Sequence, residues 1–145
     1  MMDDTYYMKE ALKEARKAME ADEVPIGAIV VCNGTIIGRG HNQTEMLSDV
    51  TAHAEIIALT AATQNLGGKY LNDATMYVTV EPCTMCAGAL SWAQLGRLVY
   101  GASDEKRGYA RLTPCPLHPK TEVSHGLMEA ECKELVLQFF NSKRR

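Results

Sequence analysis

Hydrophobic residues near the start of the chain recur every three or four positions, which is the period of one face of an α-helix. The recurring residues are Met8, Ala11, Leu12, Ala15, Ala18 and Met19. The amphipathic helix that they predict ends at "VPIG", residues 24–27. Two apolar runs, "GAIVVC" and "TIIGRG", then flank Asn33-Gly34, a dipeptide typical of tight β-hairpins.

Three further helices are indicated by their ends or by their apolar faces. Thr51 is suited to cap a helix that Gly67-Gly68 stops. Pro82 fits the first turn of the next helix, which is expected to run to about Leu95. A closing helix is predicted over residues 127–140, with an apolar face that consists of Leu127, Met128, Cys132, Leu135, Val136 and Phe139.

Strands are predicted between these helices, over 74–80, 97–102 and, last, 122–125. Residues 102–121 contain Gly108 and three prolines, which predicts a long ordered loop or a broken short helix. Strands that alternate with helices indicate a central sheet covered on both faces. We therefore expect an α/β fold with three layers, α/β/α, around a sheet of about five strands.

Two short motifs, "HAE" and "PCTMC", lie at the predicted beginnings of two helices. Cys83 and Cys86 are three residues apart, so both sulfurs can face one point from a single helical turn. The N-terminal end of a helix also favours thiolates. With His53 as a third, neutral ligand, this set suits a catalytic zinc ion that keeps its fourth position for water.

Glu55, two residues after His53, is expected to reach over the metal-bound water and to shuttle its proton. A ligating role for Glu55 is the alternative, but a fourth protein ligand would close the water site. Structural zinc is a second alternative, for which Cys115 and His118 in "CPLH" are available as extra ligands.

Composition and charge narrow the class of protein. The 145 residues suit one domain over 1–145, and five cysteines without a signal peptide or a membrane-length apolar stretch predict a cytoplasmic protein that does not enter membranes. The net charge of −3 argues against indiscriminate nucleic-acid binding, although residues 91–145 carry +3 and end in the basic tip "NSKRR". His41 and His125 are expected to be surface or hydrogen-bonding histidines.

Together, His-x-Glu and Pro-Cys-x-x-Cys resemble the signature of the zinc-dependent cytidine deaminase superfamily. The segments "EVPIGAIVV", "GRGHN", "TAHAEI", "DATMYVTVEPCTMCAGAL", "LVYGASDEK" and "HGLMEAECKELVLQFF" are similar in order and spacing to those of the tRNA-specific adenosine deaminases. This resemblance implies a cytidine deaminase-like fold with a mixed sheet, one Zn²⁺ per chain and a homodimer. It also implies conversion of adenosine to inosine at the wobble position of a tRNA anticodon loop, where zinc-bound hydroxide attacks C6 and Glu55 carries protons.

The resemblance implies roles for individual residues as well. His53, Cys83 and Cys86 would hold the zinc ion. The implied substrate contacts are Asn42 to the purine, the backbone at Ala54 and around Pro82 to the base or the developing tetrahedral centre, Val24 and Pro25 in the pocket, Asp104 and Lys106 near flanking nucleotides, and Phe140 with the basic end on the tRNA surface.

Two segments depart from the family pattern. "SWAQLGR" carries Trp92 and lacks the expected basic residue, and a tryptophan there is closer to guanine deaminases. The loop "QTEMLSDV" lacks a proline that often precedes "TAHAE". Two alternatives therefore stay open: a deaminase of guanine or cytosine as free base or nucleoside, and a non-catalytic binding module stabilised by zinc.

Overall fold

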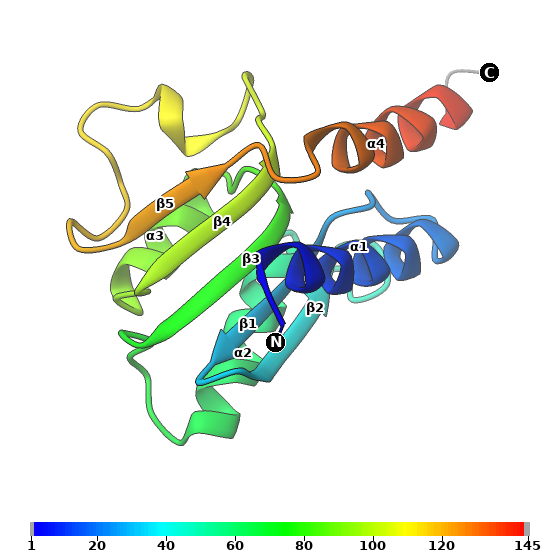
Figure 1. Cartoon of the computed structure of the whole chain (residues 1–145). Helices are drawn as coiled ribbons and strands as arrows, with labels where there is room; N and C mark the ends of the chain where they lie inside the picture. Colours follow the sequence, from blue (N-terminus) through cyan, green and yellow to red (C-terminus); the bar gives the residue numbers. More distant parts are fainter. Residues whose placement is uncertain (1, 144–145) are drawn as a thin grey trace.

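The computed structural model describes residues 2–143, and a five-stranded mixed sheet forms their centre (Figure 1). Its order is β2-β1-β3-β4-β5. Strand β1 pairs antiparallel with β2 and β3, whereas the β3–β4 and β4–β5 pairs are parallel. The strands are β1 Gly27–Cys32, β2 Thr35–His41, β3 Ala74–Val80, β4 Arg97–Ala102 and β5 Glu122–His125. The predicted α/β fold with a mixed sheet of about five strands is confirmed.

Helices cover both faces of this sheet (Figure 1). Helices α1 (Asp4–Glu20) and α4 (Glu129–Lys143) lie in front of it in this view, whereas α2 (Ala54–Leu66) and α3 (Thr84–Trp92) lie behind it. A short 3₁₀ helix, η1 (Tyr109–Arg111), interrupts the long segment between β4 and β5. Within residues 2–143, none of the helices combines the length and the apolar character needed to cross a bilayer.

Each face of the sheet has its own apolar core. The front core includes Met8, Leu12, Ile29, Val99 and Cys132. The back core includes Val30, Met76, Val78, Leu90 and Leu98. Burial of both faces explains why the central strands are almost continuously apolar. The hairpin between β1 and β2 turns at Asn33-Gly34 as predicted, and both residues have positive φ, 52° and 75°.

The beginning of α2 differs from the sequence-based prediction. His53, rather than Thr51, is the N-cap residue. The cause is local competition, because the Thr51 N–H and hydroxyl both donate to Asp49 Oδ1, at 2.8 and 2.7 Å. Thr51 therefore stabilises the preceding turn, and the helix begins directly after the histidine.

Helices α3 and α4 also have different ends from those predicted. Cys83 caps α3, so Pro82 lies just outside the helix, which ends at Trp92 and not near Leu95. Helix α4 begins at Glu129 because Met128 has φ 55°, which a helix cannot contain. Of its predicted apolar face, only Cys132 and Phe139 are fully buried.

The backbone of α2 lies directly on β2 because two glycines of this strand carry no side chain. A Cβ at Gly38 would lie 2.3 Å from the carbonyl oxygen of Ala58, and one at Gly40 would lie 2.5 Å from that of Ala54. Ala54 and Ala58 are themselves completely buried. This close contact fixes the N-terminal end of α2, which carries the "HAE" motif.

Substitution of Gly40 tests this contact. Gly40→Ala is expected to lower the free energy of unfolding by about 2 kcal/mol, because the new methyl group would collide with backbone that cannot move independently. The matched control is Gly88→Ala in α3, where a Cβ meets nothing within 4 Å. It should be neutral or stabilise the protein by up to about 1 kcal/mol through helix propensity. Urea unfolding followed by circular dichroism measures both, and equal stability of Gly40→Ala and the wild type would contradict the prediction.

Candidate active site

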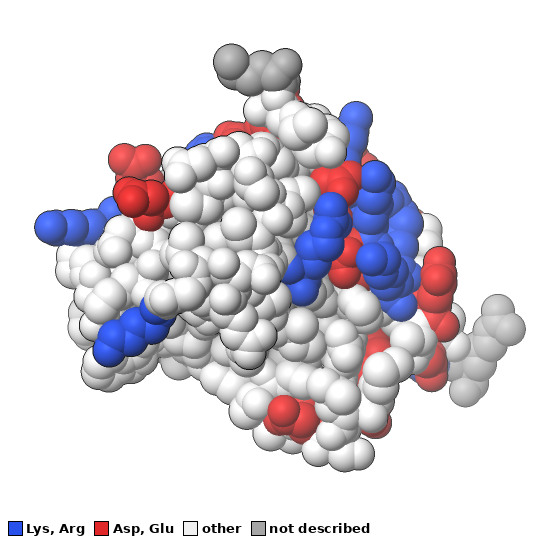
Figure 2. Space-filling view, turned by 90° about the horizontal axis from the view of Figure 1, so that it is seen from below, with Lys and Arg blue, Asp and Glu red and all other residues white. Residues whose placement is uncertain are grey.

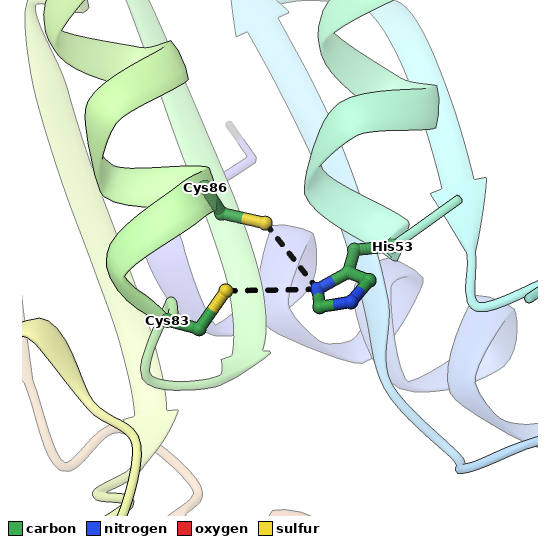
Figure 3. Close-up of side chains that lie close together, drawn as sticks. All are labelled: His53, Cys83 and Cys86. Carbon is green, nitrogen blue, oxygen red and sulfur yellow. Dashed lines mark hydrogen bonds between the residues drawn. The ribbon is translucent and has the colours of Figure 1, made fainter. Parts of the chain in front are cut away.

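The two sequence motifs meet where the N-terminal ends of α2 and α3 face one another (Figure 3). His53 is the N-cap of α2, Cys83 is the N-cap of α3, and Cys86 lies in the first turn of α3. The Nδ1 atom of His53 lies 3.7 Å from the Cys83 sulfur and 3.5 Å from the Cys86 sulfur. All three donor atoms lie within 4.8 Å of one another.

This donor set fits a tetrahedral zinc ion. Zinc–sulfur bonds of about 2.3 Å and zinc–nitrogen bonds of about 2.0–2.1 Å give a sulfur–nitrogen edge of about 3.5 Å. The two observed sulfur–nitrogen distances agree with this edge. Among residues 2–143, neither Cys115 nor His118 joins the group, and the Glu55 carboxylate lies outside it as well. The site therefore offers three protein ligands and not four.

Hydrogen bonds within the group prepare one sulfur for metal binding. The Cys86 thiol, together with His53, lowers the pKa of Cys83 to about 3. The position of Cys83 at the N-terminus of α3 favours the thiolate in the same sense. The bond to Cys83 in turn raises the pKa of His53. The Cys83 thiolate and the protonated His53 ring therefore form an ion pair. A divalent cation that binds both side chains displaces the proton that lies between them.

Glu55 lies in the first turn of α2, where its side chain is almost completely buried. Burial raises the pKa of its carboxyl group to about 7. The side chain also interacts with the Cys86 thiol, so it lies at the edge of the donor group without belonging to it. A carboxyl group with a pKa near neutrality can both accept and donate a proton during a reaction.

Asn42 lies directly after β2, at the N-terminal end of α2. Its Oδ1 atom accepts a hydrogen bond of 2.8 Å from the N–H of Ala54, the first residue of α2. This bond supplies the cap that the His53 side chain does not provide. Because the oxygen is the acceptor, the amide nitrogen Nδ2 must point elsewhere. Within residues 2–143, Nδ2 makes no hydrogen bond, so it is available as a donor to a ligand.

Two backbone groups near the donors take part in hydrogen bonds within the chain. The N–H of Ala54, a residue whose backbone is predicted to contact the substrate, donates to Asn42. The carbonyl oxygen of Pro82 likewise accepts a hydrogen bond of 3.0 Å from the N–H of Tyr109. Val24 and Pro25 lie immediately before β1.

Three other expected contacts lie together in a different place. Asp104, Lys106 and Phe140 line one groove of about 560 Å³ between the loop that follows β4 and helix α4. The basic end of the chain is only partly described. Lys143 pairs with Asp22 at 2.5 Å, and residues 144 and 145 lie outside the described range.

Two buried acidic residues near the site were missed by the sequence analysis. Glu23 accepts hydrogen bonds from the N–H groups of Glu45 and Met46, at 3.1 and 2.8 Å. Glu81 does the same for two residues of the loop after β4. The signal was visible in "EVP" and "EPC", where a charged residue lies beside a buried apolar segment.

The remaining histidines behave as predicted. His41 Nδ1 lies 3.3 Å from a carboxylate oxygen of Glu14, so it belongs to a hydrogen-bonded cluster on the α1 side of the sheet. His125 is exposed and stacks on the ring of Tyr100, with ring centroids 5.2 Å apart. Neither residue lies in the donor group.

A three-layer α/β fold with a His-Cys-Cys group and a buried glutamate defines a protein of the deaminase class, and the model of the MafB19-like deaminase family matches residues 2–144. The chain is 47% identical over 149 residues to the tRNA-specific adenosine deaminase of Agrobacterium fabrum, a match that covers 99% of this chain and 98% of that protein. The chain belongs to the family of tRNA-specific adenosine deaminases, as the resemblance of its motifs indicated.

Solved structures give a consistent result. A structure described in a study of A-to-I editing by tRNA:A34 deaminases has 47% identity and a TM-score of 0.83, and the match covers 90% of this chain and 99% of that one. A guanine deaminase from Bacillus subtilis has 36% identity and a TM-score of 0.67, and the match covers 70% of this chain and 66% of that one. The match to this Bacillus subtilis enzyme therefore covers less of both chains than the match to the structure from the A34 deaminase study.

Removal of one sulfur tests the donor group. Cys83→Ala is expected to weaken zinc binding by at least about 100-fold, because the loss of a direct ligand should exceed the usual cost of losing an outer partner. Metal analysis after dialysis against a zinc buffer measures this loss. Cys115→Ala is the matched control, since Cys115 is exposed and lies outside the group, and it should retain the wild-type content. A full equivalent of zinc in Cys83→Ala would rule out this donor set.

Proposed function

We propose that this protein hydrolyses adenosine to inosine at the wobble position of a tRNA anticodon, with one zinc ion held by His53, Cys83 and Cys86. The observation that carries the proposal is a three-donor site beside a buried carboxyl group. The near full-length similarity to tRNA-specific adenosine deaminases supports the choice of substrate. Since tRNA is the substrate, we also infer that the protein works in the cytoplasm.

The chemistry needs a nucleophile and a proton carrier. A zinc ion held by His53, Cys83 and Cys86 would lower the pKa of a bound water molecule, so that hydroxide would be available as the nucleophile at neutral pH. Glu55 accepts a proton from the attacking water and gives it to the ring nitrogen beside C6. It then carries the proton of the hydroxyl group now on C6 to the amino group; the C6–N bond breaks, ammonia leaves, and C6 becomes a carbonyl carbon. The pKa of about 7 suits this double role, because the carboxyl group gains and loses a proton with equal ease near neutrality.

The purine is oriented by groups around the zinc ion. Asn42 donates a hydrogen bond from Nδ2 to the base, while its Oδ1 atom stays bound to the N–H of Ala54. Val24 and Pro25, which lead into β1, form the apolar wall of the pocket. The backbone around Pro82, which joins β3 to the cysteines, closes the other side. One amide thus both fixes the beginning of α2 and reads the substrate.

The anticodon loop is a suitable substrate because its bases are already unstacked in part, so extrusion of one base costs less than in a duplex. The groove that contains Asp104, Lys106 and the exposed ring of Phe140 is the proposed place for flanking nucleotides. Figure 2 shows that basic side chains on one face of the molecule are interleaved with acidic ones. This face therefore carries no unbroken basic field for indiscriminate RNA binding.

The proposal is tested with a synthetic anticodon stem-loop that carries adenosine at the wobble position and at other positions. The wild-type protein should form inosine at the wobble position alone, as measured by mass spectrometry of nuclease digests. Glu55→Gln, which keeps the size of the side chain, should lower the rate by about 10²–10⁴-fold because the proton carrier is lost. Its zinc content and circular dichroism spectrum should match those of the wild type.

Ammonia release from free guanine and free cytosine is the comparison that separates the alternatives. Activity on the free bases without activity on the stem-loop would overturn the choice of substrate. Undiminished activity of Glu55→Gln would overturn the proton-carrier role. A protein that binds zinc but deaminates none of these compounds would be a zinc-stabilised binding module.

We further propose that the protein is a homodimer that associates through the exposed side of α2 and α3. Trp92 is 85% exposed at the end of α3, beside a hollow of about 450 Å³ that is mostly apolar. The residues that line this hollow are Leu59, Thr60, Thr63, Lys69, Tyr70, Ala89, Trp92 and Ala93. In a two-fold contact, the indole of each copy can enter the hollow of the other. An exposed indole next to an apolar hollow is typical of such interfaces.

The homodimer is tested by sedimentation equilibrium. The wild type should have twice the monomer mass, and Trp92→Asp should have the monomer mass because a charge would be buried against an apolar surface. Val123→Asp on strand β5 is the matched control, since Val123 is an exposed apolar residue outside this surface, and it should remain a dimer. A dimeric Trp92→Asp variant would place the interface elsewhere.

A further inference from the structure

One buried side chain next to the metal-site turn, that of Glu81, binds the backbone of the loop that follows β4 at two places. Glu81 is 6% exposed and directly precedes Pro82 and the first cysteine. One carboxylate oxygen accepts a hydrogen bond of 3.0 Å from the N–H of Asp104, and the other accepts one of 2.9 Å from the N–H of Ala110. The carboxylate therefore bridges the two ends of the segment 104–110, the first part of this loop.

The loop is also built closely around this carboxylate. A Cβ at Gly108 would lie 2.2 Å from both Cδ and Oε2 of Glu81, although the backbone angles of Gly108, φ −63° and ψ 146°, suit any residue. Gly108 forms a β-bridge with Cys83, and the next residue, Tyr109, donates to the carbonyl oxygen of Pro82. These contacts fix the position of the loop relative to Cys83, one of the proposed zinc ligands.

The outer side of the same loop faces the groove beside α4. Asp104 accepts hydrogen bonds of 3.1 Å from the N–H groups of Lys106 and Arg107 through its Oδ1 atom. All three residues line the groove together with Phe140. A shift of the loop would therefore move two cationic side chains and the wall of the groove at once.

We propose that Glu81 is a positioning residue that sets the register between the reacting base and the nucleotides that flank it. It does not touch the reacting atoms. Its two hydrogen bonds hold Lys106 and Arg107 at a fixed place relative to Cys83, so a base at the zinc site and a phosphate in the groove are bound in one geometry. This inference rests on the proposed function, because it concerns how the anticodon loop is seated.

Glu81→Gln tests the inference, because an amide has only one acceptor oxygen for two N–H groups. The KM for the anticodon stem-loop should rise about tenfold, as expected when a buried donor loses its partner, while kcat changes by less than about twofold. Glu10→Gln is the matched control. Glu10 has the same 6% exposure and two ionic partners, Lys13 and Arg39, but lies on α1. It should keep the wild-type KM.

A double-mutant comparison separates positioning from general support of the structure. In a background with Lys106→Ala and Arg107→Ala, Glu81→Gln should raise KM by less than about twofold, since the groups that it positions are gone. Gly108→Ala is a second variant for the case that Glu81→Gln does not fold. Its new methyl group would collide with the Glu81 carboxylate, so it should also raise the KM for the stem-loop about tenfold.

Three outcomes would overturn the inference. The first is a fall in kcat at unchanged KM, the second is loss of zinc from Glu81→Gln, and the third is an equal KM effect in both backgrounds. If the wild type does not deaminate the stem-loop, the proposed function fails instead, and stem-loop affinity measured by fluorescence anisotropy still decides the role of Glu81. Affinity should then fall about tenfold in Glu81→Gln and be unchanged in Glu10→Gln. Equal affinity of the Glu81 variant and the wild type would overturn the inference.

Discussion

The contact between the backbone of α2 and the glycines of β2 is the constraint on which the site depends. The donor atoms of the site come from the ends of two helices, and a helix end can be placed only as accurately as its helix. Gly38 and Gly40 allow α2 to approach until backbone meets backbone, so the helix has little freedom to slide or tilt. Asn42 then fixes the first turn by accepting the N–H of Ala54. These two contacts together determine the positions of His53 and Glu55.

Three buried glutamates, Glu23, Glu55 and Glu81, lie around this framework, and they differ in their hydrogen bonds. Glu23 and Glu81 each lie beside a strand and bind backbone N–H groups of a loop, so their burial is compensated by hydrogen bonds. Among residues 2–143, the Glu55 side chain binds the backbone of its own residue and the Cys86 thiol, and burial raises the pKa of its carboxyl group to about 7. The same residue type thus serves two purposes, and the number of hydrogen bonds that it receives distinguishes them.

The parts of this molecule that sequence could predict are those determined by local chemistry. Asn33-Gly34 predicted the hairpin because its positive φ angles are a local requirement, and the donor residues were recognised because few residue types bind zinc. The beginning of α2 was placed wrongly because Asp49 and the helix compete for Thr51. The charged residue in "EPC" was visible beside an apolar segment, but the role of Glu81 escaped notice because its partners are backbone groups 23 and 29 residues away, which no side-chain pattern marks.

The separation of His53 from the two cysteines along the chain has a thermodynamic consequence for any metal ion that they share. His53 lies 30 positions before Cys83, so an ion shared between them would act as a cross-link that closes a loop containing α2 and β3. Such an ion binds the folded chain, in which the donors meet, so its binding free energy would add to the free energy of unfolding. Scarcity of the ion in a cell would then reduce the lifetime of the polypeptide as well as its turnover, because a larger fraction of the chain would be unfolded and accessible to proteases.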